Sequence, residues 1–173
     1  MESDEKIVIE VDDQDLLNQG DKKNAIRVLT FCLGGENYCI DINHAKEVVR
    51  LPEITRVPNT PAFIVGIINL RGEVLSVLDI HYFFGLEKKG KPQDARLIVT
   101  DVVGDSLGIM VDRIKDAIDI DQLSIQPPLA ILKGNLSAYT KGQIQLGGEI
   151  YILLDIYNIL NCDEIKNLRK GNV

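Results

Sequence analysis

The residues in this sequence best suited to acid–base chemistry are its two histidines, His44 and His81. A catalytic histidine needs a nucleophile or a carboxylate that the fold brings close to it. Asp41 and Asp79 could serve only if folding happened to bring them into place. His81 also occupies the position of Tyr157 in an internal repeat, which is typical of a packing or surface residue. We therefore expect neither histidine to act in catalysis or to bind a metal.

Two aspartates, Asp79 and Asp155, resemble the paired carboxylates that acid–base catalysis uses. Each follows the same strand in its own copy of the repeat, within the sequence Leu-Asp-Ile. An aspartate in this place caps the short helix that follows, which stabilises that helix by about 1 kcal/mol. The acids between 119 and 128 lack the glycine and the final glutamate of a calcium loop. These carboxylates predict helix caps and no metal site.

The three cysteines, Cys32, Cys39 and Cys162, are odd in number and show no C-x-x-C spacing. This pattern favours buried, reduced thiols over a disulfide framework or a zinc site. The phosphate-binding, dinucleotide-binding, zinc-protease and serine-hydrolase motifs do not occur in the sequence. The sequence therefore predicts a protein that is not an enzyme and that needs no cofactor.

The net charge of −7 and the pI near 4.8 exclude some classes of partner. Nucleic acids and anionic membranes both attract a basic surface, which this chain lacks. The N-terminus has no basic segment before an apolar core, so no signal peptide is expected. No apolar run approaches the ~18–20 residues that span a bilayer. We expect a cytoplasmic protein without direct membrane insertion.

Between its two ends the chain consists of short aliphatic segments separated by turn residues. Thr60 and Pro61 form a good helix start, so a short helix is expected over 61–66. The many short segments predict an all-β fold with a few short helices. The expected strands cover 25–33, 37–42, 44–51, 68–70 and 73–80 in the first half.

The second half of the chain repeats the first. Residues 38–51 match 107–120, and residues 71–84 match 147–160, in the same order. The two shifts, 69 and 76 residues, differ by seven, which implies a longer middle segment in the second copy. So small a unit buries only a limited core, and two units packed together are the expected stable form. Closed barrels suit such a chain because they hide strand edges.

This repeat predicts the division of the chain. A flexible acidic tail is expected over 1–24 and a polar C-terminal tail over 163–173. The domain between them, 25–162, is expected to consist of two barrel subdomains, at about 25–86 and 93–162. The polar segment 87–94 is the expected linker between the subdomains.

The stretch NTPAFIVGIINLRG, at 59–72, ends its apolar run abruptly at Arg71 and Gly72. Glycine supplies the positive φ that a tight hairpin needs, so Arg71 is expected at a hairpin tip. Two adjacent barrels leave a groove between them, and grooves at such junctions favour binding. An apolar groove flanked by Arg71 and Glu47 would suit a helical partner. On composition alone, an ordinary core with solvated charges is an equally good interpretation.

Three segments carry a resemblance to a known family. They are FCLGGENYCIDINHAKEVVR at 31–50, ITRVPNTPAFIVGIINLRGEVLSVLDI at 54–80 and LGIMVDRIKDAIDI at 107–120. Together they resemble the CheW-like domain family of bacterial chemotaxis coupling proteins, over about 24–162. The resemblance implies two SH3-like five-stranded β-barrels packed on each other, in agreement with the repeat.

The resemblance also implies partners and a binding site. The implied partners are the regulatory domain of the chemotaxis histidine kinase CheA and the cytoplasmic tip of methyl-accepting chemoreceptors. Arg71 is the arginine of the family's NLRG motif, and Glu47 lies in a matching KEV segment. The residues carried over to a receptor-binding groove are Ile42, Ala45, Glu47, Gly66 and Arg71.

The function that the resemblance implies is that of a non-catalytic adaptor. Such an adaptor couples chemoreceptors to CheA, supports assembly of the signalling array and controls kinase activity. A second hypothesis is a kinase-regulatory or array-filling module without direct receptor coupling. An enzyme that uses the histidines is a third hypothesis, and a pair of RNA-binding barrels is a fourth. The acidic charge of the chain disfavours RNA binding.

Overall fold

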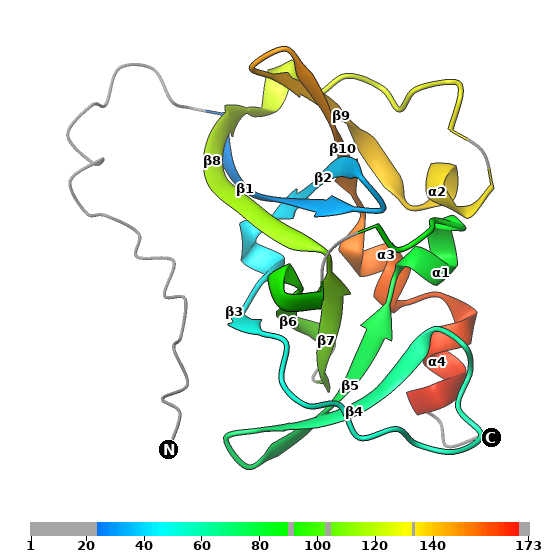
Figure 1. Cartoon of the computed structure of the whole chain (residues 1–173). Coiled ribbons are helices and arrows are strands. Elements are labelled where there is room, and N and C mark those ends of the chain that lie inside the picture. The colour runs from blue at the N-terminus through cyan, green and yellow to red at the C-terminus, as the bar shows by residue number, and fades with distance from the viewer. Residues whose placement is uncertain (1–23, 90–91, 103–104, 133, 170–173) are drawn as a thin grey trace.

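The computed structural model of the chain describes residues 24–89, 92–102, 105–132 and 134–169 (Figure 1). Within these ranges ten short strands alternate with a few short helices, as the sequence predicts. The first half contains β1 (Ala25–Leu33), β2 (Glu36–Asp41), η2 (Ile42–His44), β3 (Glu47–Arg50), β4 (Ile64–Leu70), β5 (Glu73–Asp79) and α1 (His81–Phe84). The second half contains η3 (Pro92–Asp94), β6 (Arg96–Val102), β7 (Asp105–Val111), β8 (Arg113–Asp121), η4 (Gln122–Ser124), α2 (Asn135–Ala138), β9 (Thr140–Leu146), β10 (Glu149–Leu154), α3 (Ile156–Leu160) and α4 (Asp163–Arg169). The expected acidic tail, apart from Asn24, lies outside the described residues.

The strands of the described chain form two five-stranded sheets, each curled into a small barrel. We call the sheet with the order β3-β6-β7-β5-β4 barrel I, and the sheet with the order β8-β1-β2-β10-β9 barrel II. In barrel I the chain leaving β3, at one edge, pairs through Thr55 with Ile67 of β4, at the other edge. In barrel II the chain leaving β8 pairs in the same way, through Gln126, with Gln143 of β9. The predicted two-barrel fold is confirmed.

The sheets correct the expected division of the chain at 25–86 and 93–162. Barrel I holds β6 and β7 from the second half between β3 and β5, and barrel II holds β1 and β2 from the first half between β8 and β10. The linker expected at 87–94 joins two elements of barrel I. The chain crosses between barrels after β2 and again at Asp112, between β7 and β8. The first hairpin of each half therefore belongs to the barrel that holds the remaining strands of the other half: β1–β2 lies in barrel II, and β6–β7 lies in barrel I.

The repeat explains why this exchange is symmetric. In the repeat, β3, β4 and β5 correspond to β8, β9 and β10, and β6 and β7 correspond to β1 and β2. With these equivalents, the order β3-β6-β7-β5-β4 of barrel I becomes the order β8-β1-β2-β10-β9 of barrel II. The parallel pair β5 with β7 corresponds in this way to the parallel pair β10 with β2. Each exchanged hairpin pairs on both its sides with strands of the other half: β6–β7 pairs with β3 and β5, and β1–β2 pairs with β8 and β10. The two copies therefore complete each other.

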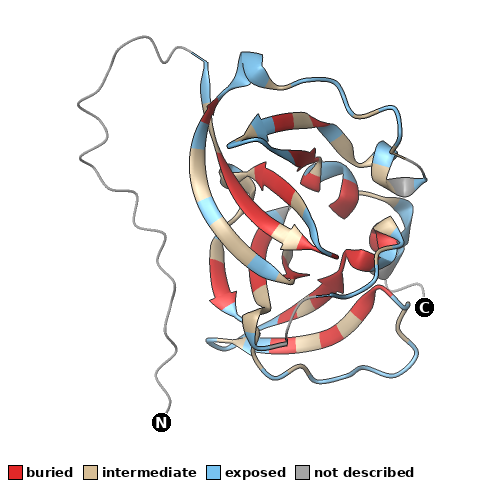
Figure 2. Cartoon of the chain, turned by 45° about the horizontal axis from the view of Figure 1, so that its top comes forward, coloured by how far each residue is buried: buried red, intermediate tan, exposed pale blue. Residues whose placement is uncertain are grey.

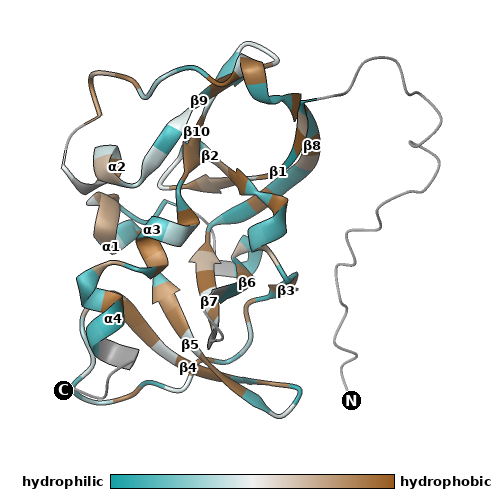
Figure 3. Ribbon diagram, turned by 180° about the vertical axis from the view of Figure 1, so that it is seen from behind, coloured by the Kyte–Doolittle hydropathy of each residue, from teal (hydrophilic) through white to brown (hydrophobic). Residues whose placement is uncertain are grey.

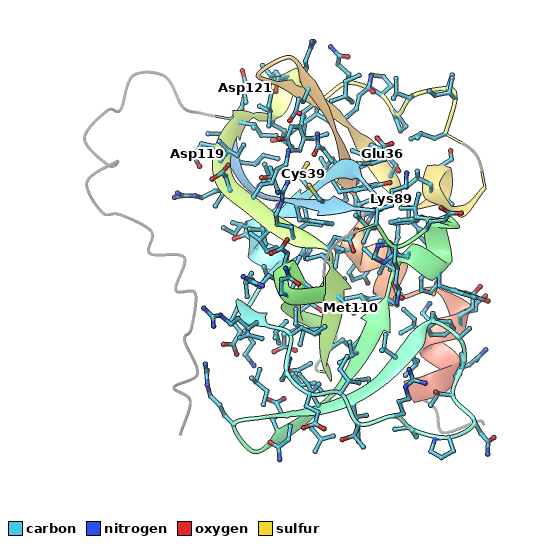
Figure 4. The ribbon with its side chains drawn as sticks, viewed as in Figure 1. Glu36, Cys39, Lys89, Met110, Asp119 and Asp121 are labelled. Carbon is cyan, nitrogen blue, oxygen red and sulfur yellow. The ribbon has the colours of Figure 1, made fainter. Side chains whose placement is uncertain are left out.

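Buried side chains form three clusters that follow the two faces of the strands. One cluster fills barrel I, one fills barrel II, and the largest lies between the barrels and beneath α1, α3 and α4. In β6, Leu97 and Val99 point into barrel I while Ile98 packs between the barrels. Figure 4 shows Met110 inside barrel I and Cys39 inside barrel II. Strands buried on both faces explain the unbroken aliphatic runs of the sequence (Figures 2 and 3).

One local prediction is wrong. Pro61 begins only a single turn, which the Ile64 N–H closes on the Pro61 carbonyl at 2.9 Å, and β4 starts at once. The branched residues of 64–68 pair with β5, and this pairing overrides the helix-start signal. The polar segment expected at 163–173 begins with helix α4, which buries Ile165 in the cluster between the barrels. No helix within the described ranges is both long enough and apolar enough to cross a bilayer.

The strand exchange makes a prediction about fragments. Residues 1–89 and 92–173, produced as separate chains, each carry a hairpin that belongs to the other chain's barrel. We expect neither fragment to unfold cooperatively in dilute solution, and an equimolar mixture to restore the spectrum of the intact protein. Far-UV circular dichroism and ¹H–¹⁵N correlation spectra measure both. Intact protein cleaved within 87–94 after folding is the control, and a folded, monomeric 1–89 fragment would contradict the exchange.

Candidate functional site

The β4–β5 hairpin places Arg71 at its tip, as the sequence predicts. Arg71 and Gly72 both have positive φ angles, +52° and +90°, which is the geometry of a tight two-residue turn. The Asn69 side-chain oxygen accepts a hydrogen bond of 2.8 Å from the Gly72 N–H and closes the turn. The paired strands β4 and β5 on either side hold this tip in place, so the arginine projects from a rigid turn.

The second copy of the repeat shows what this turn requires of its backbone. The β9–β10 hairpin has Gly147 and Gly148 at the matching positions, with φ angles of +57° and +84°. A left-handed conformation costs an ordinary L-residue roughly 1–2 kcal/mol, and glycine avoids this cost. Arg71 therefore occupies a position at which glycine would be more stable. Such strain, where a barrel holds it in place, points to a function for the side chain.

Arg71 pairs with Glu47 of the edge strand β3. Its guanidinium nitrogen lies 3.2 Å from the Glu47 carboxylate, and the exposed fractions of the two side chains are 50% and 14%. The contact lacks hydrogen-bond geometry, so the buried Glu47 Oε2 keeps an unused acceptor site. A guanidinium carries five N–H donors in a planar fork, and most of them stay available here. The half-exposed guanidinium can therefore bind a carboxylate of a partner.

The other three predicted site residues have different surroundings. Ile42 and Ala45 are half-buried at the crossing from barrel II to barrel I, where both pack against the cluster between the barrels. The Asp41 carboxylate caps this crossing by accepting from the Asn43 N–H at 2.9 Å. The structure thus brings Glu47 and Arg71 together and places Ile42 and Ala45 on the segment that leads into β3.

Gly66 is buried in β4 and serves the closure of barrel I. A side chain on Gly66 would collide with the Thr55 carbonyl, because the Thr55–Ile67 bridge brings the two backbones together. Gly142 meets the Gln126 carbonyl in the same way in barrel II. The close approach in both barrels gives Gly66 a backbone role that the sequence alone did not indicate.

The two repeated aspartates differ in what they contact. The Asp155 side chain accepts from the Asn158 N–H at 3.0 Å and caps α3, as predicted. The Asp79 side chain also accepts from a backbone N–H of its helix, that of His81, the first residue of α1, at 3.1 Å, although the N-cap position itself is Ile80. Asp79 differs from Asp155 in its further contacts with the His81 ring and Lys88. His81 is buried between Asp79 and Asp112. Only the fold brings Asp112 to this place, and no spacing in the sequence indicates it.

The thiols and carboxylates of the described chain offer little to metals or electrophiles. Burial raises the pKa of the Cys39 thiol to about 12, so the thiol stays protonated and unreactive. Cys32 and Cys162 are only half-buried, although buried thiols were predicted, and none of the three cysteines is disulfide-bonded. Among the described residues, no group of three or more His, Cys, Asp or Glu side chains is arranged to hold a metal ion.

Comparisons with known proteins agree with this architecture. The model of the CheW-like domain family matches residues 27–164. The chemotaxis protein CheW of Treponema pallidum is 32% identical over 146 residues, which cover 82% of this chain and 86% of the relative. The CheW of Helicobacter pylori is 31% identical over 145 residues, which cover 84% and 87%. The crystal structure of the scaffolding protein TtCheW from Thermoanaerobacter tengcongensis matches with a TM-score of 0.73 and 34% identity, over 80% of this chain and 90% of that one.

The fold of two paired barrels is thus similar to that of a protein described as a scaffolding protein. The family match covers most of the chain, and the relatives agree over nearly their full length. The chain belongs to the CheW-like domain family, as the sequence motifs predicted.

The strain at Arg71 makes a prediction about stability. In a Glu47→Gln background, which removes the charge of its partner, Arg71→Asn should raise the free energy of unfolding by about 1 kcal/mol. Asparagine tolerates the left-handed backbone, and Asn-Gly is the favoured pair for this turn. Urea denaturation of the two variants measures the difference. A lower stability for the asparagine variant would show that the arginine, rather than the backbone, is favoured at this turn.

Proposed function

We propose that this protein is a chemotaxis adaptor that couples methyl-accepting chemoreceptors to the histidine kinase CheA. The family match and the scaffolding protein of the same fold support this role. The observation that carries the proposal furthest is the strained Arg71, which stands where the second copy of the repeat has a glycine. The adaptor would act at membrane-associated receptor arrays, which it reaches from the cytoplasm through its partners.

The proposed receptor contact is built around the Glu47–Arg71 pair. A receptor tip is a helical hairpin with charged residues, so a receptor carboxylate can form a bidentate contact with the half-exposed Arg71. Glu47 holds the guanidinium in one orientation beforehand, and this reduces the entropy lost on binding. Ile42 and Ala45 lie on the segment just before Glu47 and would supply the apolar part of the contact, while Gly66 maintains the shape of the barrel beneath it.

The proposed kinase contact uses other surfaces, at the ends of the barrels. The CheA regulatory domain has the same kind of barrels, so the contact would join barrel to barrel and be largely aliphatic. The exposed Ile150 lies beside the β9–β10 hairpin tip, away from the Arg71 turn, and offers apolar area there. A kinase-regulatory or array-filling role without receptor coupling is not favoured, because it gives Arg71 no function.

An enzymatic role is also not favoured. His81 is closed off from solvent, with 3% of its surface exposed, and therefore cannot touch a substrate. The buried Cys39 thiol is held protonated. We propose that the protein is a non-catalytic scaffold whose binding energy is concentrated in a few residues around Arg71.

A matched pair of substitutions tests the receptor contact. Arg71→Glu should weaken binding of a chemoreceptor cytoplasmic fragment by roughly ten- to a hundredfold, because it removes a charged hydrogen bond worth about 1.5–3 kcal/mol. Gly147→Glu puts the same residue at the same turn position of barrel II and should leave receptor binding unchanged. Isothermal titration calorimetry with the receptor fragment measures both affinities.

Two outcomes of this titration would contradict the proposed contact. One is normal receptor affinity for the Arg71→Glu protein, and the other is an equal loss of affinity in both variants. The second outcome would assign the effect to the strained turn rather than to the arginine. Circular dichroism of both variants confirms that each has kept its fold.

A further inference from the structure

A buried ionic cluster lies where the two barrels meet, away from the Glu47–Arg71 pair. Its centre is His81, the first residue of α1, which is 3% exposed. His81 Nδ1 lies 2.7 Å from Asp79 Oδ1 in a hydrogen bond. Nε2 lies 3.3 Å from Asp112 Oδ1 in a contact that lacks hydrogen-bond geometry. Lys88 forms an ion pair with the other oxygen of Asp79. Each ring nitrogen therefore faces a carboxylate oxygen.

Three of these residues lie close together in the chain, and Asp112 follows them at the connection between two later strands. Asp79 ends β5 and His81 begins α1, both on the barrel I side of the cluster. Asp112 is the single residue between β7 of barrel I and β8 of barrel II. Lys88 follows α1 at the start of the 87–94 segment. The cluster thus joins the end of barrel I to the point at which the chain crosses to barrel II.

Asp112 also holds the β1–β2 turn of barrel II. Its Oδ2 accepts from the Gly34 N–H at 2.7 Å, and its own N–H donates to the Cys32 carbonyl at 3.1 Å. Gly34 is buried against Leu86, whose N–H donates to the His81 carbonyl at 3.0 Å. A continuous path of polar contacts therefore runs from Asp79 through His81 and Asp112 to the turn of the other barrel.

The charge of His81 decides whether its ring can interact favourably with both Asp79 and Asp112. A neutral imidazole has one N–H, so it can donate to one of the two carboxylates and must face the other with a lone pair. An imidazolium carries N–H groups on both nitrogens, so it donates to Asp79 through Nδ1 and presents a positive charge to Asp112 at Nε2. With a single ring proton, the ring would be uncharged between the carboxylates of Asp79 and Asp112, of which Asp79 also pairs with Lys88.

We propose that His81 is an imidazolium that clasps Asp79 of barrel I to Asp112 and the β1–β2 turn of barrel II, so that the packing of the two barrels depends on pH. The clasp is independent of the proposed receptor contact. It accounts for a difference between the repeated aspartates, because Asp79 binds the His81 ring as well as the His81 N–H, while Asp155 accepts from the Asn158 N–H. It also explains why a histidine stands where the repeat has the exposed Tyr157.

The titration of these groups gives the clasp a defined pH window. Burial by itself lowers the pKa of His81, but the hydrogen bond and charge of Asp79, with the charge of Asp112, outweigh burial and raise the pKa above the ordinary 6.5. The contribution of His81 to stability is therefore complete below 6.5 and is lost as the pH rises through the raised value. Burial also raises the pKa of Asp79, but His81 and Lys88 lower it below 3.8 overall, so its contribution is lost only as the pH falls through that lowered value.

Nuclear magnetic resonance of the full chain tests the clasp directly. The sequence has two histidines, so a His44→Gln variant assigns both ring signals. We expect the His81 ring to titrate above 6.5 and the Gly34 amide signal to move with the same midpoint. Asp112→Asn keeps an oxygen acceptor for Gly34 but removes a charge, and it should shift the His81 midpoint downward. In urea, the difference in stability between the parent and His81→Gln should be larger at about pH 6 than at about pH 9.

Several results would overturn the clasp. A His81 midpoint at or below 6.5 would do so, as would an Asp112→Asn midpoint equal to that of the parent. A Gly34 amide that does not follow the His81 titration would show that the ring does not reach barrel II. The ring titration needs only the parent chain and the His44→Gln variant, so the proposal stays testable even if His81→Gln fails to fold.

Discussion

The structure depends on one constraint: the central strands of each barrel must be buried on both faces. One face of such a strand fills its own barrel and the other packs against the second barrel, as Leu97 and Ile98 do from adjacent positions. Each residue buried in this way contributes about 1.5–3 kcal/mol, and a barrel of five short strands standing alone would leave the outer faces in water. The exchange of hairpins satisfies this constraint, because each sheet contains strands from both halves of the chain and the two barrels are therefore held together.

The rigid pair of barrels in turn permits backbone strain in the β4–β5 turn at its edge. The β4–β5 turn can hold an arginine in a left-handed conformation only because the ladder between β4 and β5 fixes the strands on either side. The same rigidity fixes Glu47 on β3 within reach of Arg71. Packing of the barrels therefore fixes the position of the Arg71 guanidinium. In the proposed function, a partner helix would bind this group without further ordering of the adaptor.

Much of the fold was predictable from the sequence. Alternating short strands, the Arg71–Gly72 turn and the matched segments at shifts of 69 and 76 indicated two repeated barrels. The motifs around Glu47 and Arg71 indicated the family. The exchange of hairpins was not predictable, because the two copies carry equivalent strands and either pairing satisfies the same local pattern. The helix expected at 61–66 failed because pairing with β5 outweighs a good helix start.

The buried cluster around His81 shows a different limit. Asp112 approaches His81 only through the crossing of the chain between barrels, and long-range contacts of this kind leave no spacing to recognise. The repeat indicated a packing or surface residue at this position, and it did not indicate that His81 is buried while Tyr157 is exposed. The comparison of Arg71 with Gly147 needs both the repeat and the backbone angles. His81 and Arg71 both stand where the two copies differ.

The most direct test of the central claim is a reconstitution with three components. Autophosphorylation of the CheA kinase from the same organism is followed with a chemoreceptor cytoplasmic fragment, in the presence and absence of this protein. A coupling role predicts that the receptor fragment changes kinase activity only when the protein is present. Kinase activity that responds equally to receptor without the protein, or that never responds although the protein binds the kinase, would contradict the coupling role.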